Sequence, residues 1–435
     1  MRKFLFAIIS LSFLFTLSFI SCDSNSNQET ETNEDDTYWL NATSLKDTYS
    51  SYFDKFGIAV EYDNSYGDEL ISTIIQQGLV HHANSITMGN EFKPDFIFNW
   101  ATPNTSGSFT GSNGTTISVP TNTPNWTRPD AILKICKDTG LTMRGHVLVW
   151  HSQTPSWFFY KDFDTTSTLV DTATMNARLE WYIKTVLTHI SDWEKTNNNG
   201  EHIIYTWDVV NEAMINNGKY SDTKWLRGSD NDNSSMWYNV YGNSDEYIVN
   251  AFRYANKYAP SDVLLAYNDY NCFWDGKTDC ILKLIDDVQS HEDNNSDGFD
   301  DSDGTSVPSR IDVIGMQSHI STTWPTVDSY EEAVKKFLAK GLDVQVTELD
   351  ISTPEEYVAD ELKSVYKSYF KMFINNKKTS SSTNGISGVT FWGITDGNSW
   401  LNSTSMTAGY TRYPLLFDEN YYCKPAFYGV IEAVQ

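Results

Sequence analysis

The chain has few cysteines, and none of them is spaced like a metal ligand. Five cysteines are spread over 435 residues without a C-x-x-C pair. Cationic residues are also scarce, because 31 Lys and Arg face 57 Asp and Glu and leave a net charge of −26. Such a balance repels nucleic-acid phosphates and anionic lipids, and no basic stripe offsets it, which excludes nucleic acid as a partner. It says little about a neutral substrate.

A long hydrophobic run occurs at the N-terminus and nowhere else in the sequence. Arg2 and Lys3 precede an apolar run at 4–20, and Ser21-Cys22 is followed by polar residues. This pattern resembles a bacterial lipoprotein signal peptide, with residues 1–21 removed and Cys22 acylated. The alternative is an uncleaved anchor, although the run is slightly short for a spanning helix of about 20 residues. Either interpretation predicts an extracytoplasmic protein, and the first predicts a lipid anchor at a bacterial membrane, at the cell surface or in the periplasm.

Four cysteines remain if Cys22 carries lipid: Cys136, Cys272, Cys280 and Cys423. They permit three pairings, between which the sequence cannot choose. Cys272 and Cys280 are close enough in sequence to staple one loop, and export permits a disulfide there. Free, partly buried thiols are an equally simple alternative.

Beyond the leader, composition divides the chain into two parts. Residues 22–37 are polar and acidic without apolar periodicity, which predicts a flexible acidic tether. Residues 38–435 are globular, contain no repeat and are expected to form one domain that acts as a monomer. This length suits one barrel of about 250 residues enlarged by long loops.

Eight apolar runs alternate with helical patterns in the globular part. Several runs are continuously apolar, as expected of strands buried on both faces. Eight such strands alternating with helices predict an α/β fold, a (β/α)8 TIM barrel with long βα loops. The runs lie at 56–62, 83–90, 141–150, 204–212, 263–269, 311–320, 342–350 and 388–396.

The clearest helical pattern has apolar residues from Met175 to Trp193 on one face and ends at 197–200. Another is expected to open with Ser329 and Glu332 in capping-box spacing and to end at Gly341. Residues 101–126 are rich in Ser, Thr, Asn and Gly, and they predict a long loop after the second strand.

A second long loop, residues 291–307, is strongly acidic. Its spacing matches the first part of a calcium-binding loop, but Gly304 occupies the position of the usual bidentate Glu. The spacing permits structural calcium, whereas a solvated acidic loop explains it more simply and is the interpretation that we favour. The oxygen-bearing positions are Asp293, Asn295, Asp297 and Asp301.

Two glutamates end apolar strands, where the chemistry of a (β/α)8 barrel is placed. Glu212 closes the run at 204–212, and Glu348 lies near the end of the run at 342–350. Glycoside hydrolysis requires two carboxyl groups that flank one bond. The chain also has 14 Trp, 25 Tyr and 23 Phe, and flat rings suit the apolar faces of sugars. Either glutamate alone could instead be structural and paired with Arg or Lys. Both together favour a glycosidase.

Seven short motifs occur in one order along residues 45 to the end. They are NEFK at 90–93, RGHVLVWHSQ at 144–153, WDVVNEA at 207–213, NDYN at 268–271, GMQSH at 315–319, TELD at 347–350 and FWG at 391–393. Together they are similar to glycoside hydrolase family ten, the retaining endo-β-1,4-xylanases. The resemblance implies the same barrel, xylan or xylo-oligosaccharide as substrate, and no required cofactor.

The resemblance also implies a role for each matched residue. Glu212 is implied as acid/base and Glu348 as nucleophile, so Glu212 must be protonated while Glu348 is ionised. Asp350 is implied to fix the ring of His319, which in turn orients Glu348. Asn211 is implied to bind the 2-hydroxyl of the sugar being cleaved. The other implied substrate contacts are Asn90, Lys93, His146, Trp150, Gln153, Tyr270, Gln317, Trp392 and Trp400.

One position departs from the family pattern. The family carries Glu immediately before the Asn at position 90, whereas this chain has Gly89. The sequence therefore predicts that a carboxylate contact to the distal sugar is missing, unless the 101–126 insertion replaces it, and that Gly89→Glu raises activity on short substrates. It also leaves open a β-glucanase or mixed-linkage endoglycanase. A lipid-anchored glycan-binding protein without catalysis is a third alternative, against which the retained glutamates argue.

Overall fold

The computed structural model describes residues 37–63, 69–98, 103–121, 124–219, 224–229, 234–290, 308–353, 358–402 and 412–435. The leader with Cys22, nearly all of the tether and the acidic loop with its four calcium-type positions lie outside the described residues. The predictions made for those segments therefore stay predictions.

Eight parallel strands form a closed barrel. Each strand pairs with the next one along the chain, and the last pairs with the first through Lys55↔Gly388 and the positions that follow. The predicted (β/α)8 barrel is therefore confirmed, with all eight strands at the expected places. The strands are β1 (Lys55–Val60), β2 (Ser85–Met88), β5 (Thr142–Gly145), β7 (Ile204–Asn211), β10 (Leu264–Asp269), β11 (Val313–Met316), β13 (Asp343–Ser352) and β14 (Ile386–Phe391).

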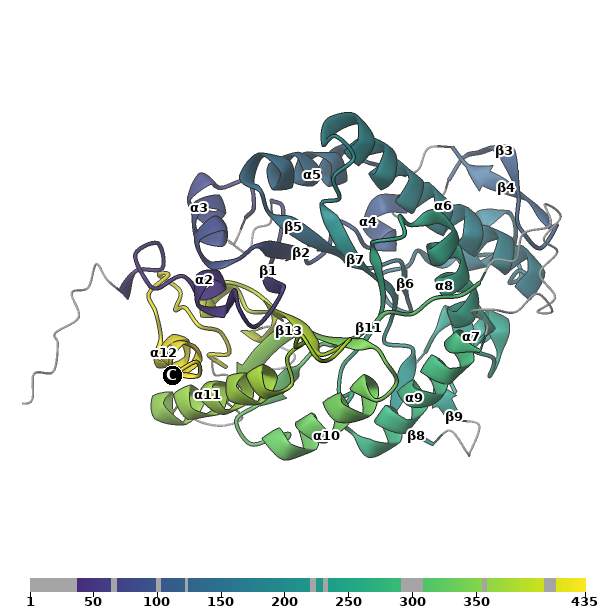
Figure 1. Ribbon diagram of the computed structural model, residues 1–435. Helices are drawn as coiled ribbons and strands as arrows, with labels where there is room; N and C mark the ends of the chain where they lie inside the picture. Colours follow the sequence, from purple (N-terminus) through teal and green to yellow (C-terminus); the bar gives the residue numbers. More distant parts are fainter. Residues whose placement is uncertain are drawn as a thin grey trace, which may run out of the picture.

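One long helix follows each barrel strand, and these helices surround the strands (Figure 1). They are α3 (Thr73–His82), α5 (Thr127–Thr139), α6 (Thr172–Asn197), α8 (Glu246–Tyr258), α9 (Asp275–Gln289), α10 (Val327–Leu338), α11 (Ala359–Asn375) and α12 (Pro425–Glu432). Shorter elements precede the first strand or lie between the strands and helices of the barrel. They are α2 (Leu45–Tyr49), α4 (Pro94–Phe98), α7 (Met236–Tyr241), β6 (Val149–Trp150), β12 (His319–Ser321) and the hairpin of β8 (Met214–Lys219) with β9 (Lys224–Leu226).

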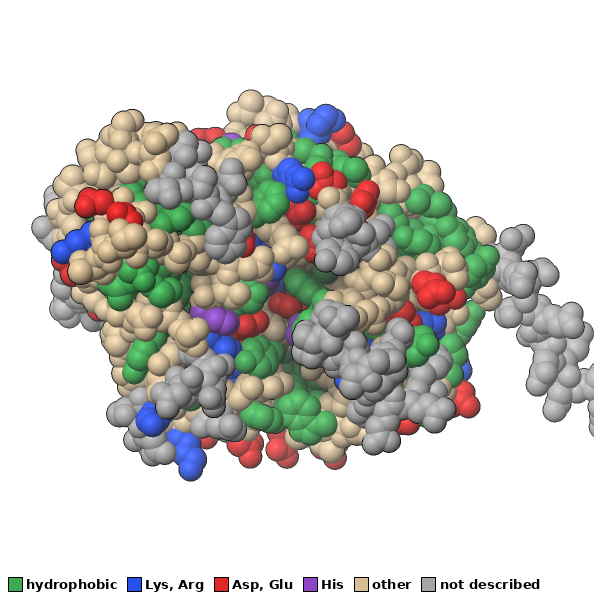
Figure 2. Space-filling view, turned by 180° about the vertical axis from the view of Figure 1, so that it is seen from behind, with side chains coloured by type: hydrophobic (Ala, Val, Ile, Leu, Met, Phe, Trp, Pro, Cys, Tyr) green, Lys and Arg blue, Asp and Glu red, His purple; other side chains and the backbone are tan. Residues whose placement is uncertain are grey.

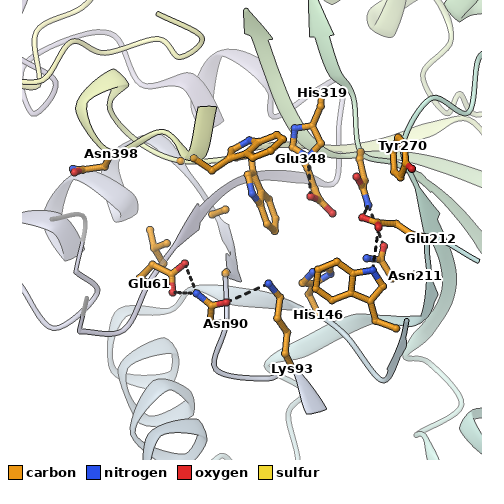
Figure 3. A pocket seen from close by; sticks show the side chains of 18 of the residues that line it. Glu61, Asn90, Lys93, His146, Asn211, Glu212, Tyr270, His319, Glu348 and Asn398 are labelled. Atoms are coloured by element: carbon orange, nitrogen blue, oxygen red, sulfur yellow. Dashed lines mark hydrogen bonds and ion pairs between the residues drawn. The ribbon is translucent and has the colours of Figure 1, made fainter. Parts of the chain in front are cut away.

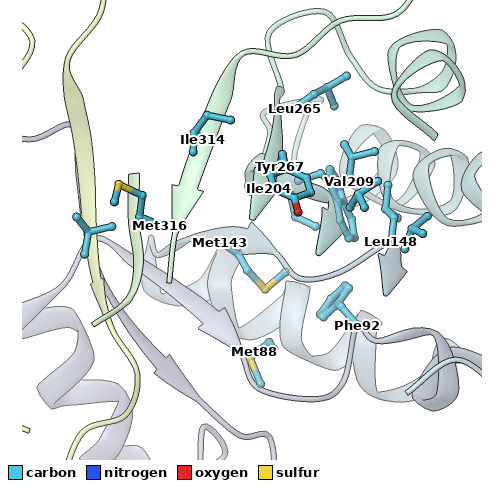
Figure 4. Close-up of a cluster of buried hydrophobic side chains, with 14 of the residues drawn as sticks. Met88, Phe92, Met143, Leu148, Ile204, Val209, Leu265, Tyr267, Ile314 and Met316 are labelled. Carbon is cyan, nitrogen blue, oxygen red and sulfur yellow. The ribbon is translucent and has the colours of Figure 1, made fainter. Parts of the chain in front are cut away.

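Apolar side chains of the strands fill the space between the barrel and its helices. Residues of β2, β5, β7, β10 and β11 are almost fully buried, as expected of strands covered on both faces, and the buried positions include polar residues such as Arg144 and Asp208. Figure 4 shows Met88, Met143 and Ile204 among side chains contributed by neighbouring strands. This packing fixes the strands and therefore the positions of the residues at their ends.

Helix α6 confirms the clearest sequence pattern, and its cap is Asp171, whose side chain accepts from the backbone N of Thr174. The predicted start of α10 was wrong. Thr326, not Ser329, caps the helix, because the Thr326 hydroxyl accepts from the backbone N of Ser329 at 3.2 Å. Ser329 therefore lies in the first turn, and Gly341 follows the end of the helix as expected.

The segment 101–126 contains an antiparallel hairpin, β3 (Thr105–Thr110) and β4 (Thr116–Pro120), where a long loop was expected. Buried Glu180 of α6 holds its turn, accepting from the Ser112 hydroxyl at 2.6 Å and from the Tyr258 hydroxyl at 2.7 Å. Lys257 completes the contact at 3.4 Å from Glu180. The hairpin thus packs on α6 at the outside of the barrel (Figure 1).

The sequence left two alternatives for the cysteines, a disulfide or thiols, and the structure shows thiols. Cys272 and Cys280 are not joined, and Cys272 Sγ lies 3.0 Å from the carbonyl oxygen of Asp269, to which it donates. Within the described ranges, no cluster of three His, Cys, Asp or Glu side chains could bind a metal. A search of the same ranges finds no helix with the length and apolar character needed to span a membrane.

Candidate active site

The polar residues at the strand ends surround one cavity of about 600 Å³. Figure 2 shows a hollow near the middle of one face, in which acidic and histidine side chains are visible. The predicted site residues that line the cavity are Asn90, Lys93, His146, Trp150, Asn211, Glu212, Tyr270, Gln317, His319, Glu348, Trp392 and Trp400.

Glu348 lies within β13 and is 5% exposed. Its Oε1 accepts from Asn268 Nδ2 at 2.8 Å, and its Oε2 lies 3.1 Å from His319 Nε2. Burial alone would raise the pKa of Glu348, but the hydrogen bond from His319, the charges of His146 and His319, and the Asn268 bond together lower it below its usual range. Glu348 is therefore an ionised carboxylate although its side chain is almost fully buried.

His319 bridges Glu348 and Asp350. Its Nδ1 lies 2.9 Å from Asp350 Oδ2, and Trp400 Nε1 donates to the same oxygen at 2.8 Å. Burial would lower the pKa of His319, but the two carboxylates outweigh burial and raise the pKa to about 10. The ring is therefore an imidazolium whose two N–H groups are fixed by the two carboxylates. Figure 3 shows its contact with Glu348.

Glu212 directly follows β7 with a φ of 54°, a left-handed conformation that is uncommon for residues other than glycine. Its Oε2 accepts from Trp150 Nε1 at 3.0 Å, and its Oε1 accepts from Gln317 Nε2 at 2.9 Å. Arg227 Nε also donates to its backbone carbonyl at 2.7 Å. Neutral donors therefore surround the Glu212 carboxyl, in contrast to the imidazolium beside Glu348.

Three amides connect the two glutamates. Asn268 Nδ2 lies 2.8 Å from Glu348 Oε1 and 2.9 Å from Asn211 Oδ1. Gln317 Nε2 lies 3.2 Å from the same Asn211 oxygen and 2.9 Å from Glu212 Oε1. The amides come from the ends of different strands, so the barrel itself fixes the relative positions of the carboxyl groups.

His146 is held beneath the cavity by Asp208. The His146 Nδ1 lies 3.0 Å from Asp208 Oδ2, and Arg144 Nε donates to the same oxygen at 3.2 Å. Burial would raise the pKa of Asp208, but Arg144 and His146 outweigh it and lower the pKa. The His146 ring also contacts Trp392 edge-on at a centroid distance of 5.6 Å. Trp392 and His146 thus form a fixed wall of the cavity.

Tyr270 forms the side of the cavity next to Glu212 (Figure 3). Its hydroxyl accepts from Arg227 Nη2 at 2.8 Å, and Lys277 Nζ lies 3.7 Å from the ring centroid. Lys277 is fully buried and pairs with Asp269 at 2.7 Å. The cation and the hydrogen bond fix the orientation of the ring at the edge of the cavity.

Asn90 and Lys93 lie on the other side of the cavity. Asn90 Oδ1 accepts from Lys93 Nζ and from Gln153 Nε2, both at 3.2 Å, and Lys93 Nζ donates to Gln153 Oε1 at 2.8 Å. Gln153 lies behind them and lines a neighbouring cavity instead of the main one. Lys93 Nζ also lies 4.9 Å from the centroid of the Trp150 ring.

Sequence reasoning assigned no specific role to four residues that lie in or beside the site. Glu61 and Asn398 line the cavity, and Asn268 contacts Glu348. His151 lies with Nδ1 4.0 Å from Glu212 Oε2, and burial, together with Arg227 and Lys277, lowers the pKa of His151 to about 3. Asn268 and His151 lie within the quoted motifs, so their positions at strand ends could have identified them. Glu61 directly follows β1, as Glu212 follows β7.

Gly89 itself brings no carboxylate to the cavity, but a carboxylate from the neighbouring strand lies beside it. The space beside Gly89 is occupied by the Glu61 carboxylate, which lies where a Gly89 side chain would begin. None of the described insertion residues 103–121 lines the cavity, so the hairpin does not replace the contact.

Chemically, the site offers one fixed anionic carboxylate, one carboxyl among neutral donors, and aromatic walls. These are the groups that acid-assisted displacement at an acetal carbon requires.

Comparison with known proteins agrees with this chemistry. A model of the family described as Glycosyl hydrolase family 10 matches residues 44–433. Endo-1,4-beta-xylanase Y of Acetivibrio thermocellus is 32% identical over 427 residues, which are 96% of this chain and 35% of that protein. The bifunctional endo-1,4-beta-xylanase XylA of Ruminococcus flavefaciens is 34% identical over 88% of this chain and 33% of its own length. The chain therefore spans about a third of the length of these curated relatives.

Among solved structures, the chain is similar to the N-terminal endo-1,4-beta-D-xylanase 10B of Clostridium thermocellum, solved as CBM22-1 and GH10 modules complexed with xylohexaose. The TM-score is 0.72 at 30% identity, over 94% of this chain and 69% of that one. The match to the family model covers nearly the whole globular part, and the barrel carries the expected residues at its strand ends. The chain therefore belongs to glycosyl hydrolase family 10.

Proposed function

We propose that this chain hydrolyses β-1,4-xylosidic bonds within xylan by a retaining double displacement. The observation that carries the proposal is the different surroundings of two glutamates in one cavity. Buried Glu348 contacts cationic His319, whereas Glu212 contacts the neutral donors of Trp150 and Gln317. The family membership and the xylanase names of the relatives support the same reaction.

In the first step, a Glu348 oxygen attacks the anomeric carbon while Glu212 transfers its proton to the leaving glycosidic oxygen. The C–O bond to the leaving sugar breaks, and an ester bond to Glu348 forms. The contacts from His319 and Asn268 keep Glu348 ionised and fix its direction of attack. The protonated carboxyl of Glu212 supplies the proton that makes the sugar a good leaving group.

In the second step, ionised Glu212 takes a proton from water, and the water oxygen attacks the same anomeric carbon. The ester bond breaks, Glu348 returns to its carboxylate, and the product keeps the β configuration. Two carboxyl groups and water balance this reaction, so it requires no metal or organic cofactor. Asn211, between the two glutamates, is suitably placed to bind the 2-hydroxyl of the sugar under attack.

The alternatives have less support. The β-glucanase alternative rested on a missing carboxylate at Gly89, and Glu61 supplies a carboxylate there. A glycan-binding protein without catalysis does not require the hydrogen bonds between charged groups that connect Asp350 to His319 and His319 to Glu348. Neither alternative therefore accounts for the arrangement as well as xylan hydrolysis does.

A substrate panel tests the proposal. Soluble xylan, mixed-linkage glucan and carboxymethyl cellulose are incubated with the full chain, and new reducing ends and product lengths are measured. We expect xylan to be cleaved fastest and into mixed oligosaccharides, with the first product in the β form by NMR. Faster cleavage of a glucan would favour the rival substrate, an α product would overturn the retaining mechanism, and absence of turnover would favour a binding protein.

We also propose that residues 1–21 are a lipoprotein signal peptide, that Cys22 is acylated, and that residues 22–37 tether the catalytic domain of 38–435 to a bacterial membrane. The support is the sequence alone: a short basic start, an apolar run, and Ser21-Cys22 before a polar segment. An enzyme anchored outside the cytoplasm would meet a polymer too large to enter the cell.

A further inference from the structure

Glu61 lies at the end of the cavity that is remote from Tyr270 (Figure 3). It directly follows β1, and its two carboxylate oxygens both lie 3.0 Å from Asn90 Nδ2. Asn90 in turn contacts Lys93, whose Nζ lies over the Trp150 ring. Glu61 is thus the outermost member of a polar row that leads to the residues around Glu212.

Gly89 is the neighbour that makes room for this carboxylate. Strands β1 and β2 pair Ala59↔Thr87 and Val60↔Met88, so the next positions in register are Glu61 and Gly89. A Cβ built on Gly89 would lie 2.1 Å from Glu61 Oε1 and 2.8 Å from Glu61 Cδ. Gly89 is not among the glycines with positive φ, so its backbone does not require glycine. The position of the Glu61 side chain is what requires it.

The Glu61 carboxylate has acceptor capacity that the described residues leave unused. An ionised carboxylate offers about four acceptor sites. Within the described ranges, its recorded hydrogen bonds come from one nitrogen, Asn90 Nδ2. Glu61 lines the cavity, so its side chain lies within reach of a ligand there. Burial and nearby Glu91 raise the pKa of Glu61 to about 7, against the opposing effects of Asn90 and Lys93, so a further donor would stabilise the ionised form.

We infer that Glu61 binds hydroxyl groups of the sugar next to the one being cleaved, on the side away from the leaving group, and that it takes over this contact from the carboxylate that residue 89 lacks. The inference rests on the proposed function and names a specificity-determining residue for it. Because Glu61 reaches the sugar from β1 and not from β2, Gly89 is the necessary partner of Glu61 and not a loss of binding. The earlier expectation that Gly89→Glu raises activity is thereby reversed.

Two aryl substrates separate sugar binding from support of the fold. An aryl β-xyloside occupies the cleaved-sugar position alone, whereas an aryl β-xylobioside also reaches the neighbouring position. We expect Glu61→Ala to lower kcat/KM on the xylobioside roughly 10- to 100-fold, the range of one or two hydrogen bonds to a charged group. The loss on the xyloside should be at least tenfold smaller. Equal losses on both substrates would mean that Glu61 supports the site as a whole and makes no contact specific to the neighbouring sugar, and would overturn the inference.

Exchanging the two positions gives a second, independent test. Gly89→Glu should lower kcat/KM on the xylobioside because its side chain collides with Glu61. The double variant Glu61→Ala/Gly89→Glu should be more active on the xylobioside than either single variant, because the carboxylate returns from the other strand. Unchanged or raised activity of Gly89→Glu, or a double variant no better than Glu61→Ala, would contradict the inference.

The controls separate folding and function. Exposed Glu201 lies just before the first residue of β7, whereas the site lies after the last one. Glu201→Ala should therefore leave kcat/KM on both substrates unchanged. If Glu61→Ala is too unstable to assay, Glu61→Gln keeps the shape and should still lose more on the xylobioside than on the xyloside. Failure of the wild type to hydrolyse either aryl substrate or xylan would refute the proposed function itself, whereas an active wild type with equal losses in the variants refutes the role of Glu61 alone.

Discussion

The Nε2 of His319 lies 3.1 Å from Oε2 of Glu348, and its hydrogen bond and charge are among the effects that together outweigh burial and lower the pKa of the carboxylate. His319→Asn removes the hydrogen bond and the charge of His319, leaves only His146 and Asn268 to oppose burial, and should therefore raise the pKa of Glu348. The acidic limb of the kcat/KM profile, which reports the free enzyme, should then move to higher pH by roughly 1–2 units, with lower activity at its maximum. Xylan hydrolysis from pH 3 to 10 measures this shift.

His189→Asn is the matched control, because His189 also pairs with a carboxylate, Asp130 at 2.7 Å, but does not line the cavity. Its acidic limb should coincide with that of the wild type. An unmoved acidic limb in His319→Asn would contradict the assignment of that limb to Glu348.

The same histidine predicts a dependence of stability on pH. Its pKa rises from the usual 6.5 to about 10 on folding, so the folded state binds its proton more tightly. The resulting stabilisation is complete below about pH 6.5 and is lost as pH rises through about 10. The difference in free energy of unfolding between wild type and His319→Asn should therefore be roughly 2–4 kcal/mol larger at pH 6 than at pH 10. Denaturant titrations at the two pH values measure it, and a difference independent of pH would contradict a charged His319.

We expect the Glu180→Ala variant to be less stable than the wild type but to keep its activity. Its carboxylate is 1% exposed and accepts from Ser112 and Tyr258. Glu180→Ala leaves these groups without their acceptor and should cost roughly 2–3 kcal/mol of unfolding free energy. Because the hairpin packs outside the barrel, kcat/KM on xylan at 25 °C should change less than twofold. Loss of activity without loss of stability would place the hairpin in substrate binding instead.

Lipidation is testable through Cys22. The full chain, produced in a bacterium with a lipoprotein pathway, should incorporate a labelled fatty acid and fractionate with membranes. Cys22→Ala should abolish the label and either release the protein or leave its signal uncleaved. Cys423→Ala is a suitable control, since Cys423 lies in the catalytic domain and should leave labelling unchanged. A wild-type protein that carries no label would favour a plain membrane anchor.

Much of the fold could be predicted because barrel strands are buried on both faces and several of the eight runs are largely apolar. The hairpin of β3 and β4 could not, since its strands are largely exposed and rich in Ser, Thr and Gly, a composition shared with loops. The cap of α10 was misplaced by three residues because Thr326 and Ser329 can both accept from a backbone N–H, and only the path of the chain distinguishes them.

The site followed from the motifs, because residues at the carboxyl ends of parallel strands meet at one end of a barrel. Glu61 was missed because the end of its strand was predicted two residues too late. The run at 56–62 was expected to be strand throughout, which placed Glu61 inside it, whereas β1 ends at Val60. Gly89, which lacks a carboxylate, and Glu61, which carries one, lie 28 positions apart in sequence but side by side in the register of β1 and β2. Their relationship can be recognised only when the pairing of the two strands is known.

The central claim is that Glu348 forms a covalent bond to the sugar and that Glu212 is needed to resolve it. Its most direct test is the intact mass of Glu212→Ala after reaction with an aryl β-xylobioside whose leaving group needs little protonation. We predict a burst of the aryl alcohol and an added mass of one xylobiosyl group, mapped by peptide digestion to Glu348, with Glu348→Ala giving no adduct. Full turnover by Glu212→Ala without an adduct, or an adduct on another residue, would contradict the account.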